Sequence, residues 1–412
     1  MATTAGGKAR FATALSKLRD AREAALSAAR EALGRLAGQP DLAVVFASGF
    51  TGEELAEIAP VLQGELKTDC LIGCAAESLV YDATEIEAER ALVVWLAQLP
   101  GVMLVPMHLQ FERTDDGVAM LGWPEQLGEQ LAAGPSLLLL ADPYSFPTDV
   151  LLSHLNRHQP DVRVFGGMAS GVTSDGDPRL IFGKDALDDG AVGVWMHGPV
   201  HVRNVVSQGC RPIGRPLVVT KAQDNVLLEL GGRPALAQLQ ELYQEATPQE
   251  QQLMQRGLHV GQVINEYQDH FGRGDFLVRN VQGIDQKAGA VAIGDYVRVG
   301  RTVQFHVRDA ATADEDLHEL LLAARRESAG PCAGALVFTC NGRGTRLFAG
   351  PHHDAQAVAR QWPALPTAGF FAQGEIGPVG GKNFVHGFTA SIALFEQASA
   401  SGYAQESQTQ ES

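Results

Sequence analysis

A pattern of strand, helix, strand and strand occurs three times along the chain and constrains the fold more than any other feature. Each copy opens with an apolar run typical of a buried strand, and the three runs lie at residues 42–48, 136–142 and 335–340. A strand, a helix and a second strand within about thirty residues form a βαβ unit, so the first two strands of each copy are predicted to be parallel. The last strand of each copy follows a turn-rich stretch and is predicted to be an antiparallel neighbour.

Local signals place several elements within this pattern. Thr51 is followed three residues later by Glu54, which is a capping box that predicts a helix start. Leucines at helical spacing across residues 8–37 predict one long amphipathic helix. The middle strands are predicted to end at equivalent positions, which are Cys74, Gly167 and Phe371.

The 412 residues exceed what one core of ordinary size accommodates, so two domains are expected. We predict an α/β protein with two related domains of mixed β-sheets packed with helices, built from repeated strand–helix–strand–strand units. The boundaries are an N-terminal helix at 1–38, domains at 39–218 and 219–397, and a disordered tail at 398–412. Within the second domain, residues 276–309 are predicted to form a β-meander with Gly and Asp turns.

Composition excludes several classes of function. The net charge of −16 repels phosphate backbones, so nucleic-acid binding is not expected. Apolar runs stay shorter than the roughly 18–20 residues of a membrane-spanning helix, and the charged N-terminal segment does not resemble a signal peptide. The five cysteines are dispersed, which argues against a disulfide framework and a zinc site and favours the cytoplasm. Cys70 and Cys74 are interpreted as buried strand thiols.

Polar residues gather where the strands of the third copy end. The turn Cys340, Asn341, Gly342, Arg343 and Gly344 follows an apolar strand, so backbone N–H groups and a guanidinium can converge there on an anion. Because an Asn-Gly pair is first of all a turn former, a purely structural role remains an alternative.

Further candidates lie after the neighbouring strand and between the halves of the chain. Glu375 could orient Arg343 or simply form a structural ion pair with it, and both alternatives stay open. Cys210 and Arg211 could line an interdomain cleft. Cys340, beside a cationic arginine and a helix start, could act as a thiolate nucleophile.

The chain resembles the FIST family over nearly its whole length. The resemblance rests on the stretches CLIGCAAES, VFGGMASG, VSQGCRPIGRPLVVTKAQDNVLLELGGRPAL, FLVRNVQGID, GALVFTCNGRG, LPTAGFFAQGEIGP and NFVHGFTASIALF. It implies FIST N and FIST C domains in a cytoplasmic sensory protein that binds small ligands such as amino acids. Arg343, Glu375, Asn383 and His386 are the residues on which we expect such a ligand to depend, together with the Cys340–Gly344 turn.

The leading expectation is a stand-alone module that binds an amino-acid-like or other anionic metabolite, signals by conformational change, and passes the signal to a protein partner. Binding without catalysis and without a cofactor or metal is expected. One alternative is a haem-binding sensor of nitric oxide, which one branch of the family suggests, with His386, His197 or Cys210 as axial ligand. The other alternative is a cysteine-dependent enzyme that uses Cys340.

Overall fold

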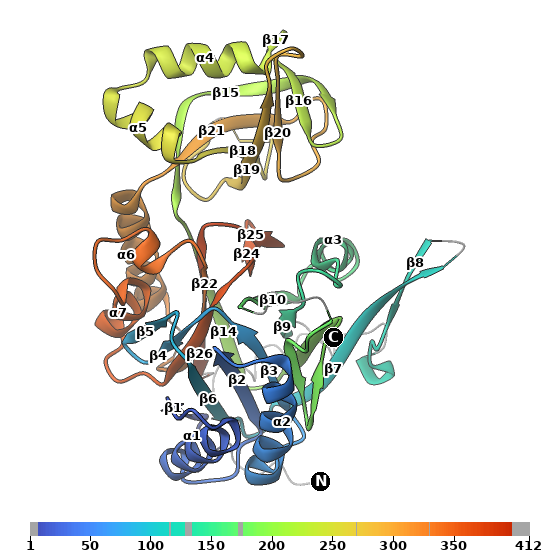
Figure 1. The fold of residues 1–412 in the computed structure, drawn as a ribbon, viewed down its shortest axis with the longest axis vertical. Helices are drawn as coiled ribbons and strands as arrows, with labels where there is room; N and C mark the ends of the chain where they lie inside the picture. Colours follow the sequence, from blue (N-terminus) through green and yellow to red (C-terminus); the bar gives the residue numbers. More distant parts are fainter. Residues whose placement is uncertain are drawn as a thin grey trace, which may run out of the picture. The chain divides into compact units, whose positions relative to one another are not determined.

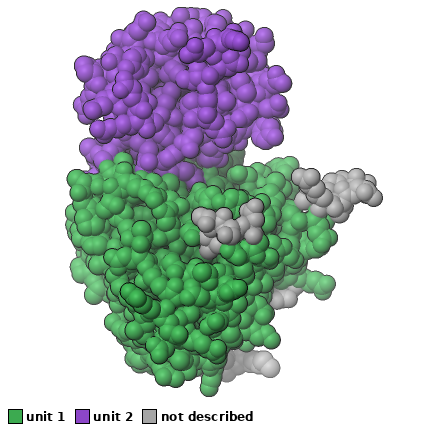
Figure 2. Space-filling model, viewed as in Figure 1, with its two compact units in different colours: residues 1–206, 319–385, 390–412 green, residues 207–318, 386–389 purple. Residues whose placement is uncertain are grey.

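The computed structural model describes residues 7–114, 117–127, 134–171, 176–268, 270–328 and 330–397. It divides into two compact units (Figure 2). Unit 1 consists of residues 1–206, 319–385 and 390–412, and unit 2 of residues 207–318 and 386–389. These units are defined by contacts in space, and their boundaries differ from those of the predicted sequence domains 39–218 and 219–397. The predicted domain boundary stays a prediction.

The three predicted copies form three repeats within unit 1 (Figure 1). The first contains β2 (Leu42–Ser48), α2 (Gly52–Leu66), β3 (Leu71–Ala76) and β6 (Ala91–Gln98). The second contains β9 (Ser136–Ala141), α3 (Thr148–His158), β10 (Arg163–Met168) and β13 (Ala191–His197). The third contains β22 (Cys332–Cys340), α7 (His353–Gln361), β23 (Thr367–Ala372) and β26 (Thr389–Gln397).

Strand pairing within the repeats agrees with the predictions. The first two strands of each repeat pair in parallel, and the last strand pairs antiparallel with the first. The capping box at the start of α2 is confirmed, because the Thr51 side chain accepts from the Glu54 N–H while the Glu54 carboxylate accepts from the Thr51 N–H. The α/β class and the repetition are therefore confirmed.

Each repeat also contributes a β-hairpin to the sheet of another repeat. The hairpins are β4 (Ser78–Tyr81) with β5 (Thr84–Glu87), β11 (Leu180–Phe182) with β12 (Asp185–Leu187), and β24 (Glu375–Val379) with β25 (Lys382–His386). The first hairpin pairs with β23 of the third repeat, the second with β3 of the first, and the third with β10 of the second. Because the exchange is cyclic, the sheet of each repeat is completed by another repeat.

A glycine marks the equivalent position in the parallel strand of each repeat. A Cβ atom would lie 2.4 Å from the Val45 carbonyl oxygen at Gly73, 1.9 Å from that of Leu139 at Gly166, and 1.8 Å from that of Val337 at Gly369. Real Cβ atoms do not approach so closely, so only glycine fits against the central strand. Aligning these glycines makes Phe370, and not the predicted Phe371, the equivalent of Cys74 and Gly167.

The prediction of one helix across residues 8–37 is wrong. The segment forms β1 (Arg10–Ser16), which pairs antiparallel with β6, and then α1 (Ala21–Leu36). The Asp20 side chain accepts from the Glu23 N–H and starts the helix there. The edge of β6 provides hydrogen-bond partners that override the helical spacing of the leucines, because secondary-structure propensity is a weak prior against tertiary pairing.

Unit 2 is built around one seven-stranded sheet in the order β15, β21, β18, β19, β20, β16 and β17. The three strands predicted for a meander form as β19 (Phe276–Asp285), β20 (Ala290–Ile293) and β21 (Thr302–Arg308). Only β19 and β20 are neighbours, and β21 pairs with β15 and β18 instead, so the prediction of a meander is wrong beyond its first hairpin. The other elements of this sheet and its helices are β15 (Cys210–Gln223), β16 (Val226–Leu230), β17 (Arg233–Pro234), β18 (Leu258–Val263), α4 (Ala235–Glu245) and α5 (Pro248–Arg256). α6 (Ala310–Glu327) leads from unit 2 back into unit 1.

The outer strands of unit 1 complete its sheets. They are β7 (Met103–Thr114), β8 (Gly117–Leu121) and β14 (Val200–Gln208), and the short helices are η1 (Glu125–Leu127) and η2 (Gly344–Arg346). Within the part of the chain that the structure describes, no helix is long and apolar enough to cross a membrane. The predicted tail at 398–412 lies outside the described residues.

Candidate functional site

The conspicuous arginine of the turn after β22 is buried in an ion pair. The Arg343 side chain is 0% exposed, and its Nε and Nη2 atoms donate to the two Asp354 oxygens at 2.7 and 2.8 Å. The Thr339 hydroxyl donates to the same carboxylate at 2.5 Å, and the His353 ring nitrogen Nδ1 lies 2.8 Å from it. This bidentate geometry is the strongest that a guanidinium and a carboxylate form.

Asp354 keeps its negative charge despite its burial. Burial acts to raise the pKa of Asp354, but the charge and hydrogen bonds of Arg343 outweigh it and hold that pKa well below the usual range. Burial likewise acts to lower the pKa of Arg343, and Asp354 reverses the effect so that the pKa of Arg343 is raised. The pair is therefore fully charged at neutral pH.

Glu85, from the β4–β5 hairpin of the first repeat, reaches the start of α7 in the third repeat. Its Oε1 atom accepts from the Asp354 and Ala355 N–H groups at 2.8 and 3.1 Å. In return, the Glu85 N–H donates to Nδ1 of His352 at 2.9 Å. Burial, and next the charge of Asp354, raise the pKa of Glu85 to about 7. The hairpin exchange thus places a carboxyl that titrates near neutrality at a helix N-terminus.

In the predicted anion site, the backbone N–H groups of Asn341, Gly342 and Arg343 have partners inside the protein. The N–H of Asn341 donates to the Ala372 carbonyl at 3.0 Å, and the N–H of Arg343 donates to the Cys340 carbonyl at 2.8 Å. The N–H of Gly342 points to the Cys340 sulfur at 3.5 Å. The turn is therefore organised by protein groups rather than left open toward an external anion.

Glutamates of the first repeat also contact this turn. Glu87 accepts from the backbone N–H and the hydroxyl of Thr345, at 3.1 and 2.6 Å, and Glu77 forms an ion pair with Arg346. At Gly344, a Cβ would lie 2.9 Å from the Glu87 carboxyl carbon, so the close approach of this carboxyl requires a glycine there. Carboxylates of the chain itself occupy the place that was predicted for an anionic ligand.

The structure brings Glu375 near Arg343, although Asp354 is the residue that orients the arginine. Glu375 is fully buried, and its charge adds to that of Asp354 in raising the pKa of Arg343. Sequence reasoning missed Asp354 and Glu85. The available signal for Asp354 was an acidic residue in the first turn of a predicted helix. No local pattern indicates that Glu85 accepts a hydrogen bond from Ala355, which lies 270 residues later in the chain.

Asn383 is committed to packing between repeats. It is buried, its side-chain oxygen accepts from the Val164 N–H at 2.9 Å, and its side-chain nitrogen donates to the Val162 carbonyl at 2.9 Å and to Asn156 at 3.2 Å. Asn156 in turn donates to the Asn383 carbonyl at 2.9 Å. These bonds hold β25 against β10 and α3, which explains the residue without a ligand.

The remaining candidates belong to unit 2 by their contacts. His386 is buried, and residues 386–389 group with unit 2. Cys210 is buried among Val263, Phe276 and Val278. Arg211 forms ion pairs with Asp309 and Glu250, each at 3.2 Å. The structure therefore does not gather Cys210, Arg211 and His386 into the cluster around Arg343.

The cysteines form no disulfide. The predicted burial of Cys70 and Cys74 is confirmed, and this burial raises the pKa of the Cys70 thiol to about 12 and that of Cys74 well above its usual value. Cys340 is half-buried at the end of β22. Among the described residues, no group of three or more His, Cys, Asp or Glu side chains could hold a metal ion.

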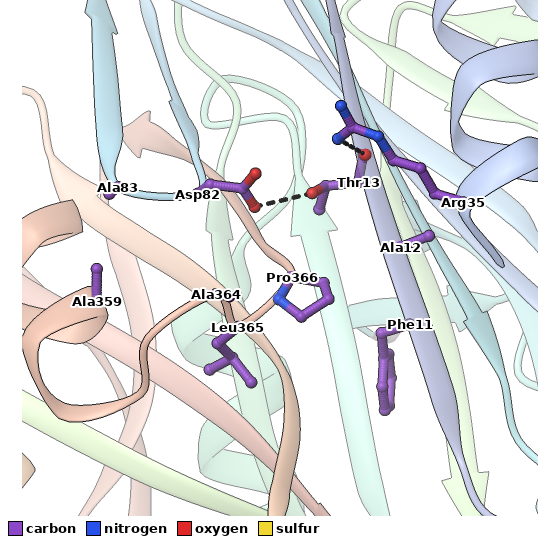
Figure 3. Close-up of a pocket in the computed structure, with 10 residues that line it drawn as sticks. All are labelled: Phe11, Ala12, Thr13, Arg35, Asp82, Ala83, Ala359, Ala364, Leu365 and Pro366. Atoms are coloured by element: carbon purple, nitrogen blue, oxygen red, sulfur yellow. Dashed lines mark hydrogen bonds between the residues drawn. The ribbon is translucent and has the colours of Figure 1, made fainter.

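A cavity of about 270 Å³ lies in unit 1 between β1, α1, the turn of the β4–β5 hairpin and the third repeat (Figure 3). It is lined by Phe11, Ala12, Thr13, Arg35, Asp82, Ala83, Ala359, Ala364, Leu365 and Pro366. Asp82 and Arg35 approach Thr13 from opposite sides in Figure 3. The Thr13 hydroxyl donates to Asp82 Oδ1 at 2.8 Å, and Arg35 Nη1 donates to the Thr13 carbonyl at 2.7 Å. The cavity therefore combines an anionic group, a cationic group and an apolar floor.

Two further cavities belong to unit 2. One, of about 360 Å³, is lined by Gly214, Arg215, Leu217, Gln238, Glu241, Leu242, Glu245 and Phe305. The other, of about 710 Å³, lies beside α4 and α5 and has a largely apolar lining. His386, His197 and Cys210, the candidate haem ligands, line none of these three cavities.

Comparisons with known proteins identify both halves of the chain. Residues 41–233 match the FIST N domain and residues 235–378 match the FIST C domain. The chain is 45% identical over 388 residues to the uncharacterized protein Rv0628c of Mycobacterium tuberculosis, an alignment that covers 94% of this chain and 99% of the relative. It is 43% identical over 378 residues to the uncharacterized protein Mb0898c of Mycobacterium bovis, with 91% and 96% covered. FIST domains are generally sensory, ligand-binding domains of signal transduction, and this chain belongs to the FIST family.

Proposed function

We propose that this protein is a cytoplasmic sensory module that binds a small amino-acid-like metabolite in the cavity of unit 1 that Asp82 and Arg35 line. The observation that carries the proposal is that Asp82 and Arg35 both line one cavity of about 270 Å³. A carboxylate and a guanidinium complement the ammonium and carboxylate of a zwitterion. Phe11, Leu365 and Pro366 offer apolar contacts for a ligand side chain.

Both charged groups are held in place by the protein and retain capacity for a ligand. Asp82 Oδ1 accepts from Thr13 and, at 3.3 Å, from the Thr367 N–H. Arg35 Nη1 is fixed by the Thr13 carbonyl and the Tyr81 hydroxyl, and Nη2 by Glu31. No hydrogen bond to Asp82 Oδ2 or from Arg35 Nε is recorded among the described residues. Preorganised charges lower the ordering entropy that ligand binding has to overcome.

The position of Asp82 offers a route from ligand binding to conformational change. Asp82 lies in the turn of the β4–β5 hairpin, and its N–H donates to the Thr367 carbonyl at the start of β23, at 2.8 Å. The same hairpin carries Glu85, which caps α7. A ligand that binds Asp82 therefore favours the arrangement in which the first and third repeats are joined, and a change in that equilibrium is the signal that a partner protein would read.

Calorimetry and thermal unfolding with a panel of L-amino acids and small dicarboxylates test the proposal. A ligand at 100 times its Kd adds about 2.7 kcal/mol of stability, and we expect R35Q and D82N to lose most of that gain. R30Q is the matched control, because Arg30 lies on the same helix and pairs with Glu65 at 3.0 Å but does not line the cavity. Binding that is equal in R35Q, D82N and R30Q would place the ligand elsewhere.

A further inference from the structure

The largest of the three cavities, in unit 2, has a lining that differs in chemistry from the cavity in unit 1. It measures about 710 Å³ and lies between one face of α4, the end of α5 and strands β18 and β19. Leu236, Leu239 and Tyr243 recur at helical spacing along α4, so they share one face of that helix. Its volume falls in the range that is typical of small-molecule sites.

An irregularity in β19 completes the apolar wall. Val281 and Ile284 both line the cavity although they are three residues apart, whereas residues of a regular strand share a face at spacings of two. The pairing of β19 with β20 shifts register between Val281 and Gly283. A bulge of this kind re-aims the side chains that follow it, which brings Ile284 to the side of Val281.

The cavity has no charged group among its eleven lining residues. Its polar side chains are Gln240, Gln244, Gln255 and Tyr243. Gln255 donates to the Tyr243 hydroxyl oxygen at 2.6 Å, which fixes the phenol between α4 and α5. Among the described residues no acceptor is recorded for the proton of that hydroxyl. The lining therefore provides apolar contacts together with one positioned hydrogen-bond donor.

We propose that this cavity binds an uncharged, mainly hydrocarbon small molecule that carries one acceptor oxygen, such as a medium-chain ketone, ester or lactone. Leu239 and Met254, both largely buried, form the floor, and Ile284 lies at the rim. An ionised ligand is disfavoured, because no lining residue offers a countercharge and desolvation of a charge is costly. The site is separate from the Asp82–Arg35 cavity and does not depend on the function proposed for it.

Isothermal titration and ligand-observed NMR with 2-decanone as the probe test this inference on the full-length protein. We expect saturable binding of 2-decanone and binding of decanoate at pH 8 that is at least tenfold weaker. Tyr243→Phe should weaken binding of the ketone about three- to tenfold, since it removes one hydrogen bond. Gln255→Ala is the control for the loss of the hydrogen bond between α4 and α5, because it removes that bond but leaves the Tyr243 hydroxyl in place.

A matched pair of tryptophan variants tests the location. Ile284 in the cavity and Val218 outside it are strand residues of the same unit with 49% and 47% of their surface exposed. I284W should weaken binding of 2-decanone at least tenfold, whereas V218W should leave it unchanged. The proposal is overturned if the two variants bind 2-decanone equally, or if decanoate binds as tightly as the ketone. It is also overturned if the protein self-associates and I284W, but not V218W, abolishes that self-association. If I284W does not fold, the preference for the neutral probe and the Tyr243→Phe result decide.

Discussion

Two arginines of unit 1 meet carboxylates from different parts of the chain in contrasting surroundings. Arg343 is 0% exposed and bonds to both oxygens of Asp354, which is 1% exposed. Arg35 has a side chain that is 45% exposed and faces Asp82 across a cavity. Both arginines have a carboxylate partner in the protein, Asp354 for Arg343 and Glu31 for Arg35, but only Arg35 borders a cavity that can admit a ligand. The difference teaches that a conspicuous motif can mark a structural ion pair, while a cavity is lined by residues that no motif indicates.

Replacement of Arg343 should produce the largest loss of stability. A small loss would contradict the contrast between the buried Arg343 and the exposed Arg35. Arg343→Ala leaves the Asp354 carboxylate buried and unpaired, so we expect a loss of about 3–5 kcal/mol in the free energy of unfolding. Arg343→Lys should recover only part of it, because an ammonium lacks the planar fork. Urea unfolding followed by circular dichroism measures the loss.

Arg30→Ala is the control for this experiment. Arg30 also makes two bonds to one carboxylate, that of Glu65, but its side chain is 65% exposed. Its removal should change stability far less than Arg343→Ala does, because solvent screens an exposed ion pair. A stable Arg343→Ala protein that no longer binds the amino-acid ligand would instead return the binding site to the turn after β22.

Glu85 should make stability depend on pH near neutrality. Its pKa is about 7 in the folded protein and about 4.5 when unfolded, so the folded state binds the proton more tightly. The contribution of Glu85 to stability is therefore fully present below about pH 4.5 and is lost as the pH rises through 7, by about 3 kcal/mol. Denaturant midpoints between pH 5 and 8 should fall in the wild type and fall less in Glu85→Gln. Identical pH profiles for the two proteins would show that Glu85 titrates normally.

The glycines of the parallel strands should tolerate no side chain. Gly369→Ala forces a Cβ atom against the Val337 carbonyl, so we expect a loss of about 1–3 kcal/mol. Gly34→Ala, on helix α1 with no atom within 4 Å of the added Cβ, should instead stabilise by about 0.5–1 kcal/mol. Thermal unfolding of both variants tests the equivalence of the repeats, and a neutral Gly369→Ala would argue against it.

The smallest effect should come from the cavity itself. Because Arg35 is half-exposed, Arg35→Gln should shift the free energy of unfolding by no more than about 1 kcal/mol without ligand. Loss of ligand binding with preserved stability would sharpen the contrast with Arg343. A collapse of the melting temperature in Arg35→Gln would instead show that its bonds to Thr13 and Tyr81 are structural.

The fold could be predicted further than the site. Apolar runs, the Thr51 capping box and the turn residues predicted the three repeats and their strand directions, because these signals are local. The strand β1 was missed, since its partner β6 lies some 80 residues away, as the pairing of Phe11 with Ala97 illustrates. The nearness of Glu375 to Arg343 was expected, because the ends of neighbouring strands meet at one edge of a sheet, and the charge of Glu375 does act on Arg343.

The sequence by itself determined the α/β class, the threefold repetition, the capped helix α2 and the family, because each depends on residues that are close together along the chain. Only the tertiary structure decided which repeat each hairpin joins, that Asp354 pairs with Arg343 while Glu85 binds the start of α7, and that Asp82 and Arg35 line a cavity. The physical reason is that charge pairing and burial depend on contacts between distant segments. A guanidinium that is conspicuous in the sequence acquires its role only from the carboxylate that the fold brings to it.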